Sequence, residues 1–312
     1  MILSKKPHIL IIGSSNTDLT IKSEKLPSPG ETVIGNEFFI ASGGKGANQA
    51  VAARRAGANV TFIAKIGDDD FGRNNIQLYQ NDGINTDHIL IDKNNYSGIA
   101  LIMVDSKGEN LISVASNSNY NFHPKDIESK KEIIKTADII LIQNEIPDQT
   151  NLTVINMAFD LKIPLIFNPA PGPKKPLSST ILKKIKYLTP NKKELELVTG
   201  KLIKEETDIY TIGQELVQSG IENLILTLGN KGSLLINKNE TIAIPAFKVD
   251  AIDTVGAGDC FNGYLGAMLA SGKSLYDSIK IASAAAAISV TKRGAQPSIP
   301  NYNEVVHFIE TH

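Results

Sequence analysis

The chain has 312 residues, of which 42% are hydrophobic, enough for one large core or two smaller ones. Its 32 basic and 33 acidic residues leave a formal net charge of −1, so no global field attracts it to nucleic acid or to an anionic membrane. No apolar run approaches the roughly 20 residues of a membrane span, and the single cysteine, Cys260, excludes an internal disulfide. We expect a globular protein of the reducing cytosol, without nucleic-acid or membrane partners.

The first predicted strand, residues 8–12, ends at Gly13 and leads to Asn16 and Asp18, whose side chains are suited to binding vicinal hydroxyl groups. Residues 32–41 and 98–115 then read as β-strands without an intervening helix, the second stretch with a hairpin at Ser106–Gly108. Because both stretches lie near candidate ligand residues, we expect a small separate sheet, from about residues 16–41 and 97–115, that forms a lid over a ligand site.

The segment SGGKGANQ at 42–49 precedes an Ala-rich amphipathic helix that runs to Ala56 and is capped by Gly57. Its glycines give a helix N-terminus with unpaired amide groups. Lys45 has an alternative interpretation as a solvated lysine, but its place between glycines on this turn favours a binding role.

From about Asp138 onward, short β-branched runs alternate with amphipathic helices. The runs are residues 139–142, 165–167, 187–189 and 224–228. This alternation predicts an α/β fold, a three-layer sandwich with a mainly parallel central sheet, in a single domain over 1–312. The polar or permissive residues that follow these strands are Asn144, Glu145, Asn168, Asn191, Thr227 and Gly229. They are expected to converge at the carboxyl edge of the sheet, although each can also be a simple turn former.

The segment IDTVGAGD at 252–259 places an acid directly behind a glycine-lined turn, and helical periodicity begins right after it. Asp259 therefore lies in a first helical turn. Gly256 and Gly258 leave backbone amides bare, and together with the helix dipole these form a site for an anion such as phosphate. A carboxylate beside an anion site suits phosphoryl transfer to a hydroxyl group, with an ordinary helix cap as the alternative for this motif alone.

Seven segments in the same order give the chain a resemblance to the PfkB family of carbohydrate kinases over nearly its full length. They are GSSNTD at 13–18, GGKGANQA at 43–50, the Glu145 of IQNEIP, PNKKELE at 190–196, TLGNKG at 227–232, DTVGAGD at 253–259 and GAQPSIP at 294–300. The resemblance implies ATP-dependent phosphorylation of D-ribose at its 5-hydroxyl, to give ribose 5-phosphate and ADP, by a cytoplasmic homodimer joined through the β lid. Deoxyribose, fructose or a nucleoside is the alternative acceptor. A sugar-binding protein without catalysis is disfavoured because Asp259 and its glycine turn are intact.

The resemblance also implies a role for each matching residue. Asp259 is the expected general base, and Gly256, Ala257 and Gly258 are the expected anion hole. The expected sugar-binding residues are Asn16, Thr17, Asp18, Gly44, Lys45, Gly46, Ala47, Asn48, Glu145 and Asp259. The expected nucleotide-binding residues are Asn191, Glu194, Thr227, Leu228, Gly229, Asn230, Lys231, Gly232, Gly258, Asp259 and Ser283.

Two metal ions follow from the same resemblance. Asn191 and Glu194 would help place Mg²⁺ and its waters around the phosphates. Potassium would be held beside the anion hole by oxygen ligands from Asp253, Val255, Ser289, Lys292, Gly294 and Ser298. The chain departs from the family pattern at Tyr264, where a small residue is preferred, and at Ser283, where Asn or His is frequent near the adenine.

Overall fold

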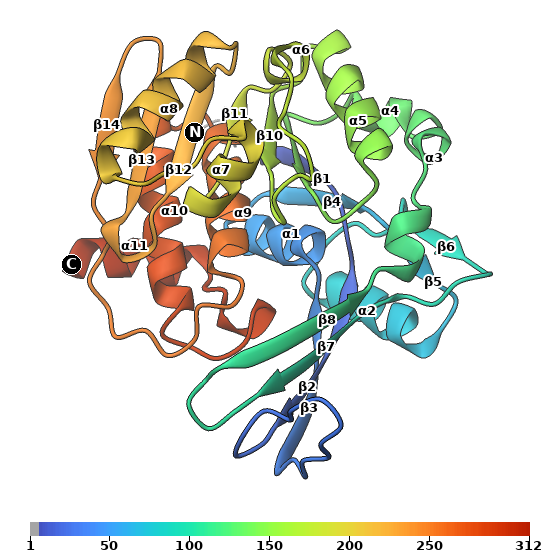
Figure 1. Ribbon diagram of the computed structural model, residues 1–312. Coiled ribbons are helices and arrows are strands. Elements are labelled where there is room, and N and C mark those ends of the chain that lie inside the picture. Colours follow the sequence, from blue (N-terminus) through green and yellow to red (C-terminus); the bar gives the residue numbers. More distant parts are fainter. Residues whose placement is uncertain (1–5) are drawn as a thin grey trace.

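The β-branched runs of the sequence form an eight-stranded sheet in the computed structural model, which describes residues 6–312 (Figure 1). Its strand order is β14-β13-β12-β11-β10-β9-β1-β4. The strands are β1 (His8–Ile12), β4 (Asn59–Ile63), β9 (Ile139–Gln143), β10 (Leu165–Asn168), β11 (Tyr187–Leu188), β12 (Asn223–Thr227), β13 (Ser233–Asn237) and β14 (Thr241–Ile244). Pairing is parallel from β12 to β4, and β13 and β14 add antiparallel at one edge. The predicted mainly parallel sheet is confirmed.

The helices cover both faces of this sheet, which makes the three layers (Figure 1). They are α1 (Lys45–Arg55), α2 (Asp70–Asn81), α3 (Pro124–Glu128), α4 (Lys131–Ile134), α5 (Asp148–Asp160), α6 (Ser179–Leu182), α7 (Lys192–Thr199), α8 (Glu206–Gln218), α9 (Ala257–Ala270), α10 (Leu275–Ser289) and α11 (Tyr302–Thr311). Alternate residues of β1 enter different cores: Ile9 belongs to the core that includes residues of α1, α9 and α10, whereas Leu10 belongs to the core that includes residues of α5, α7 and α8. Because both faces are covered, β1 reads as a continuous apolar run.

A second, four-stranded sheet of order β3-β2-β7-β8 projects from the main body (Figure 1). It consists of β2 (Asn16–Lys22), β3 (Glu37–Gly43), β7 (Gly98–Val104) and β8 (Asn110–Ala115). The expected small sheet is confirmed, but its first stretch begins later than predicted. Residues 32–36 form a loop in which Asn36 N–H donates to the carbonyl of Lys22 at 2.9 Å, so the regular ladder starts only at Glu37.

The remaining elements are short. β5 (Lys65–Gly67) pairs with β6 (Leu90–Asp92), and 3₁₀ turns occur at η1 (Asn117–Asn121), η2 (Gly229–Lys231) and η3 (Gln296–Ser298). Tyr264, the departure noted in the sequence, is fully buried in α9, and its hydroxyl donates to the carbonyl of Pro300 at 2.8 Å. The predicted domain starts at residue 1, and its first five residues lie outside the described part. Within that part, no helix is long and apolar enough to cross a membrane.

Candidate active site

The N-terminus of α9 presents a free amide to open space. Gly256 is the N-cap with φ +76°, and a Cβ there would lie 2.9 Å from that of Ala295, so both its conformation and its packing require glycine. The N–H of Ala257 donates to the carbonyl of Thr254 at 3.3 Å. The N–H of Gly258 has no acceptor among residues 6–312, and a Cβ on Gly258 would meet nothing within 4 Å. Of the predicted anion-hole residues, Gly258 therefore has a free amide, whereas the amide of Ala257 is already engaged.

The carboxylate of Asp259 is held by two consecutive amide side chains of α1. Asn48 Nδ2 donates to Asp259 Oδ2 at 2.9 Å, and Gln49 Nε2 donates to Asp259 Oδ1 at 3.1 Å. Asp259 is 5% exposed. We predicted Asn48 as a sugar-binding residue, whereas Gln49 was missed; the signal was its place beside Asn48 in the glycine-rich segment. The neighbouring Cys260 is fully buried, and burial raises the pKa of its thiol to about 12, so it is not a nucleophile.

A second carboxylate, Asp18, lies near Asp259 without a hydrogen-bond partner in the described chain. It occupies the space beside Gly43, where a Cβ would lie 2.3 Å from Asp18 Oδ2. Burial raises the pKa of Asp18 to about 6, and the negative charges of Glu145 and Asp259 act in the same direction. A partly buried carboxylate with free lone pairs is suited to accept hydrogen bonds from ligand hydroxyl groups.

Lys45 and Glu145 lie near Asp18 and Asp259 at the start of α1, and these four charged residues form one cluster, called here the Asp259 cluster. Glu145 Oε2 accepts hydrogen bonds from the hydroxyl of Ser14 at 2.5 Å and from the backbone N–H of Lys45 at 2.9 Å. The negative charge of Asp259 is the largest influence on the Lys45 ammonium and raises its pKa, so Lys45 is a cation here. The interpretation of Lys45 as a solvated lysine is not supported, because its side chain is partly buried among carboxylates.

The other predicted sugar-binding residues lie where the loop after β1 meets α1. Asn16 Oδ1 accepts from Asn119 Nδ2 at 2.8 Å, and Thr17 Oγ1 accepts from Asn75 Nδ2 at 3.2 Å. The backbone amides of Gly46 and Ala47 bond to Ser14, and Gly44 is the N-cap of α1 with φ +88°. The supporting residues Asn75 and Asn119 were not predicted from the sequence.

Asn191 and Glu194 form a capping box at the start of α7. Asn191 Oδ1 accepts from Glu194 N–H at 2.8 Å, and Glu194 Oε2 accepts from Asn191 N–H at 2.9 Å. Glu194 Oε1 has no partner within residues 6–312, and burial raises the pKa of this carboxyl group. Lys45 and Asp259 are among the charges that act on Glu194, which places it in the same electrostatic neighbourhood.

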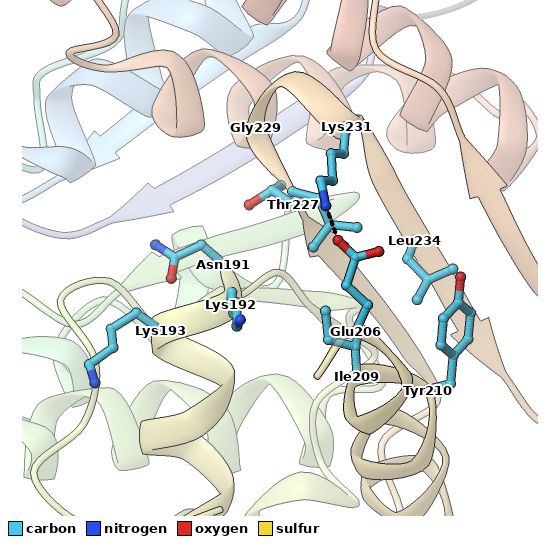
Figure 2. Close-up of a pocket in the computed structure, with 11 residues that line it drawn as sticks. Asn191, Lys192, Lys193, Glu206, Ile209, Tyr210, Thr227, Gly229, Lys231 and Leu234 are labelled. Atoms are coloured by element: carbon cyan, nitrogen blue, oxygen red, sulfur yellow. Dashed lines mark hydrogen bonds and ion pairs between the residues drawn. The ribbon is translucent and has the colours of Figure 1, made fainter. Parts of the chain in front are cut away.

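A cavity of about 490 Å³ opens beside Asn191, between α7, α8 and the loop after β12 (Figure 2). The predicted nucleotide-binding residues that line it are Asn191, Thr227, Leu228, Gly229 and Lys231. Lys231 pairs with Glu206 of α8 beside this cavity (Figure 2). Asn230 and Gly232 belong to the same loop, which closes through Leu228 N–H to Gly232 C=O at 2.8 Å. Ser283 lies on α10 and does not line this cavity.

The predicted potassium ligands come from the turn before α9, from the C-terminal end of α10 and from the segment that follows α10. Asp253 Oδ1 accepts from Val255 N–H at 3.0 Å, and Asp253 Oδ2 accepts from Gly294 N–H at 2.8 Å. The carbonyl of Ser289, the last residue of α10, accepts from Lys292 N–H at 3.1 Å, and the hydroxyl of Ser298 in η3 donates to Ala295 C=O at 2.7 Å. The atoms that would bind the potassium ion are all oxygens, as a hard cation requires.

The polar residues after the strands do not all converge. Asn168 and Glu145 lie in or beside the Asp259 cluster, whereas Asn144 Nδ2 donates to the carbonyl of Pro171 at 2.8 Å. Asn144 is therefore a turn former, which is the alternative that the sequence left open.

A family model for pfkB family carbohydrate kinases matches residues 6–302. The chain is 38% identical over 302 residues to a ribokinase of Haemophilus influenzae, covering 97% of this chain and 98% of that protein. It is 35% identical over 305 residues to a deoxyribokinase of Salmonella typhi, with coverage of 97% and 99%. The solved structure of Arabidopsis thaliana ribokinase complexed with ribose and ATP superposes with a TM-score of 0.91 at 29% identity, covering 98% of this chain and 99% of that one. With its order of motifs, its fold and its helix-terminal acid, the chain belongs to the pfkB family of carbohydrate kinases.

Proposed function

We propose that the protein phosphorylates D-ribose at the 5-hydroxyl, using ATP and releasing ribose 5-phosphate and ADP. The observation that carries this proposal is the placement of Asp259: a carboxylate held by two amides lies in the first turn of α9, one residue after the free amide of Gly258. Ribokinase relatives that match nearly the full length of the chain support the acceptor sugar.

In this proposal the sugar lies between the small sheet and α1. Asp18 accepts hydrogen bonds from ring hydroxyls, Lys45 and Glu145 bind further hydroxyls, and Gly44 and Gly46 let the start of α1 pack closely against residues 13–16. Residues 16–41 and 97–115 act as the lid, because they form the sheet that carries Asp18. Such a lid excludes water from the reacting groups.

The chemistry is an in-line phosphoryl transfer. The 5-hydroxyl oxygen forms a bond to the γ-phosphorus of ATP, the bond from that phosphorus to the β,γ-bridging oxygen breaks, and ADP leaves. Asp259 accepts the hydroxyl proton, and the proposed anion hole at residues 256–258 binds charge on the transferred group through the free amide of Gly258. The nucleotide extends toward the loop 227–232, with Ser283 at its border.

Two metal ions fit the residues present. Glu194 has a free carboxylate oxygen, which suits a Mg²⁺ ion that keeps most of its waters, and Asn191 stands beside it. Mg²⁺ would neutralise negative charge on the phosphates, and K⁺ would stabilise the turn before α9 electrostatically. The potassium ligands would be Asp253, Val255, Ser289, Lys292, Gly294 and Ser298, from the turn before α9 and from the end of α10 with the segment after it, which Asp253 joins.

We also propose that the protein is a cytoplasmic homodimer joined through the small sheet. The register places Ile21 opposite Phe38 and Leu19 opposite both Ile40 and Leu101, so these side chains share one face. Ile21, Phe38, Ile40, Leu101 and Leu111 are each 44–59% exposed. This face, called here the outer lid face, is opposite to the one that carries Asp18, so a second copy can cover it without blocking the sugar.

Deoxyribose is the alternative acceptor that most needs to be distinguished from ribose, because a deoxyribokinase relative matches as much of the chain as a ribokinase relative does. The test is ADP release with ATP across a panel of ribose, deoxyribose, fructose and nucleosides. We expect the highest kcat/KM for ribose, because groups that bind the 2-hydroxyl are left unpaired by deoxyribose. A higher kcat/KM for deoxyribose would replace the proposed acceptor, and no ADP release with any acceptor would reject the kinase itself.

A further inference from the structure

Behind Asp259 lies a buried chain of amide side chains whose hydrogen-bond directions are fixed by one backbone carbonyl. Thr189 C=O, just after β11, accepts from Asn168 Nδ2 at 2.9 Å. A carbonyl cannot donate, so the amide of Asn168 has one possible orientation and its Oδ1 must face the other way. That oxygen faces Gln49.

The next amide is oriented in turn. Gln49 Nε2 donates to Asn168 Oδ1 at 3.2 Å and to Asp259 Oδ1 at 3.1 Å, and Gln49 Oε1 accepts from Gln143 Nε2 at 2.7 Å. Both protons of the Gln49 amide are used, and the side chain is fully buried. Gln49 therefore always presents a donor, and never its oxygen, to Asp259.

The same threonine also supports the helix turn that carries Asp259. Thr189 Oγ1 donates to Asn262 Oδ1 at 2.6 Å, and Asn262 Nδ2 donates to the carbonyl of Gly258 at 2.8 Å. Thr189, just after β11, is thus linked through Asn168 and Gln49 to the Asp259 carboxylate. It is also linked through Asn262 to Gly258, whose amide is free. This linkage keeps the carboxylate and the anion-binding turn in one fixed relation.

We propose that Gln49 is a positioning residue for Asp259: anchored through Asn168 to the Thr189 carbonyl, it fixes the rotation of the carboxylate and keeps Oδ1 an acceptor. Asn48 holds the other oxygen, so the lone pairs left free on Asp259 point in a defined direction. This inference rests on the proposed role of Asp259 as the base. Its consequence is that Gln49 affects turnover without touching sugar or nucleotide.

The first test is Gln49→Met, which keeps the volume of the side chain but removes both donors. We expect kcat to fall about 10- to 100-fold while the KM values for sugar and ATP change little, because a misoriented base slows chemistry rather than binding. A kcat within about twofold of the parent would overturn the inference.

The second test is Gln49→Glu, which has nearly the same shape and places a carboxyl group against Asp259 Oδ1. Two carboxyl groups in contact share one proton, so the pH of half-maximal kcat should move upward by about one unit or more. The other charged groups around Asp259 are Asp18 of β2, Lys45 of α1, Glu145 after β9 and Glu194 of α7, and all are retained. A pH profile identical to that of the parent would contradict the inference.

Asn151→Asp is the matched control for buried charge. Asn151 is 3% exposed and donates to the backbone carbonyl of Gln143 at 2.8 Å, not to Asp259. It should leave the pH profile in place, and if it moved the profile as far as Gln49→Glu, buried charge alone would explain the effect. Full activity in Asp259→Asn would instead reject Asp259 as the base. The two variants therefore distinguish failure of the proposed base from failure of the proposed role of Gln49.

Discussion

Asp253 and Gly294 are 41 residues apart in the chain, yet the carboxylate Oδ2 of Asp253 accepts the N–H of Gly294 at 2.8 Å. The other oxygen accepts the N–H of Val255, so one side chain joins the turn before α9 to the loop after α10. The proposed potassium ligands lie on this turn, on the last residue of α10 and on the segment that follows it.

This connection predicts the effect of Asp253→Ala. Loss of the side chain separates the two loops and removes the one charged ligand, so we expect a kcat at least about 10-fold lower and no remaining response to potassium. The measurement is kcat in potassium and in tetramethylammonium buffers, for the parent and the variant. A parent enzyme with equal rates in the two buffers would reject the cation site.

The raised pKa of Asp18 predicts how sugar binding depends on pH. Hydroxyl groups donate best to the ionised carboxylate, and its pKa near 6 in the sugar-free protein means that acid removes this form. The KM for ribose should therefore rise as the pH falls below about 6, and the rise should be weaker in Asp18→Asn. A ribose KM that stays constant between pH 5 and 8 would show that Asp18 does not bind the sugar.

The same shift predicts a gain in stability from Asp18→Asn without sugar. Because the folded pKa is raised above its ordinary value of 3.8, the contribution of Asp18 to stability is fully present below that pH and is lost as the pH rises through about 6. At pH 8 the variant should raise the free energy of unfolding by on the order of 1–3 kcal/mol, measured by denaturant titration. At pH 4 the gain should be much smaller.

Gly43→Ala should act on the sugar through Asp18. The added Cβ would lie 2.3 Å from Asp18 Oδ2, so the carboxylate must move, and the ribose KM should rise about 10-fold or more. Combining the change with Asp18→Asn is the control. If displacement of Asp18 is the cause, the double variant binds no worse than Asp18→Asn alone; additive losses would assign the effect to the backbone instead.

The outer lid face predicts the oligomeric state. Leu101→Lys places a charge in the middle of that face, where Leu101 is 53% exposed, and should convert a dimer into single chains in sedimentation experiments. Leu202→Lys, at an equally apolar position that is 71% exposed on the main body, is the matched control and should leave the dimer intact. A parent protein that sediments as a monomer would exclude this contact.

The first strand, the parallel strands between residues 139 and 228, and the place of Asp259 in a first helical turn were predictable because they follow from local periodicity and from one glycine-lined turn. The chain from Thr189 through Asn168 to Gln49 was not, because its members come from different elements and their amide directions depend on how those elements pack. The start of β3 was missed for a related reason. Residues 32–36 have strand-like composition, but the carbonyl of Lys22 accepts the N–H of Asn36 in a loop before the ladder begins.

The type of group at Asp18 was predictable from the sequence, but its surroundings were not. The sequence indicated a hydroxyl-binding acid, but the need for glycine at position 43 arises from the pairing of β2 with β3, which places Gly43 opposite Asn16. The capping box between Asn191 and Glu194 could have been read from the sequence, since Asn followed three residues later by Glu is its signature.

The most direct measurement is the kcat of Asp259→Asn together with its affinity for ribose by calorimetry. Asparagine keeps the size of the side chain but cannot accept the hydroxyl proton. We predict that ribose binding is retained while kcat falls by roughly 10³-fold or more. A variant that keeps most of the parent's turnover would contradict the central claim.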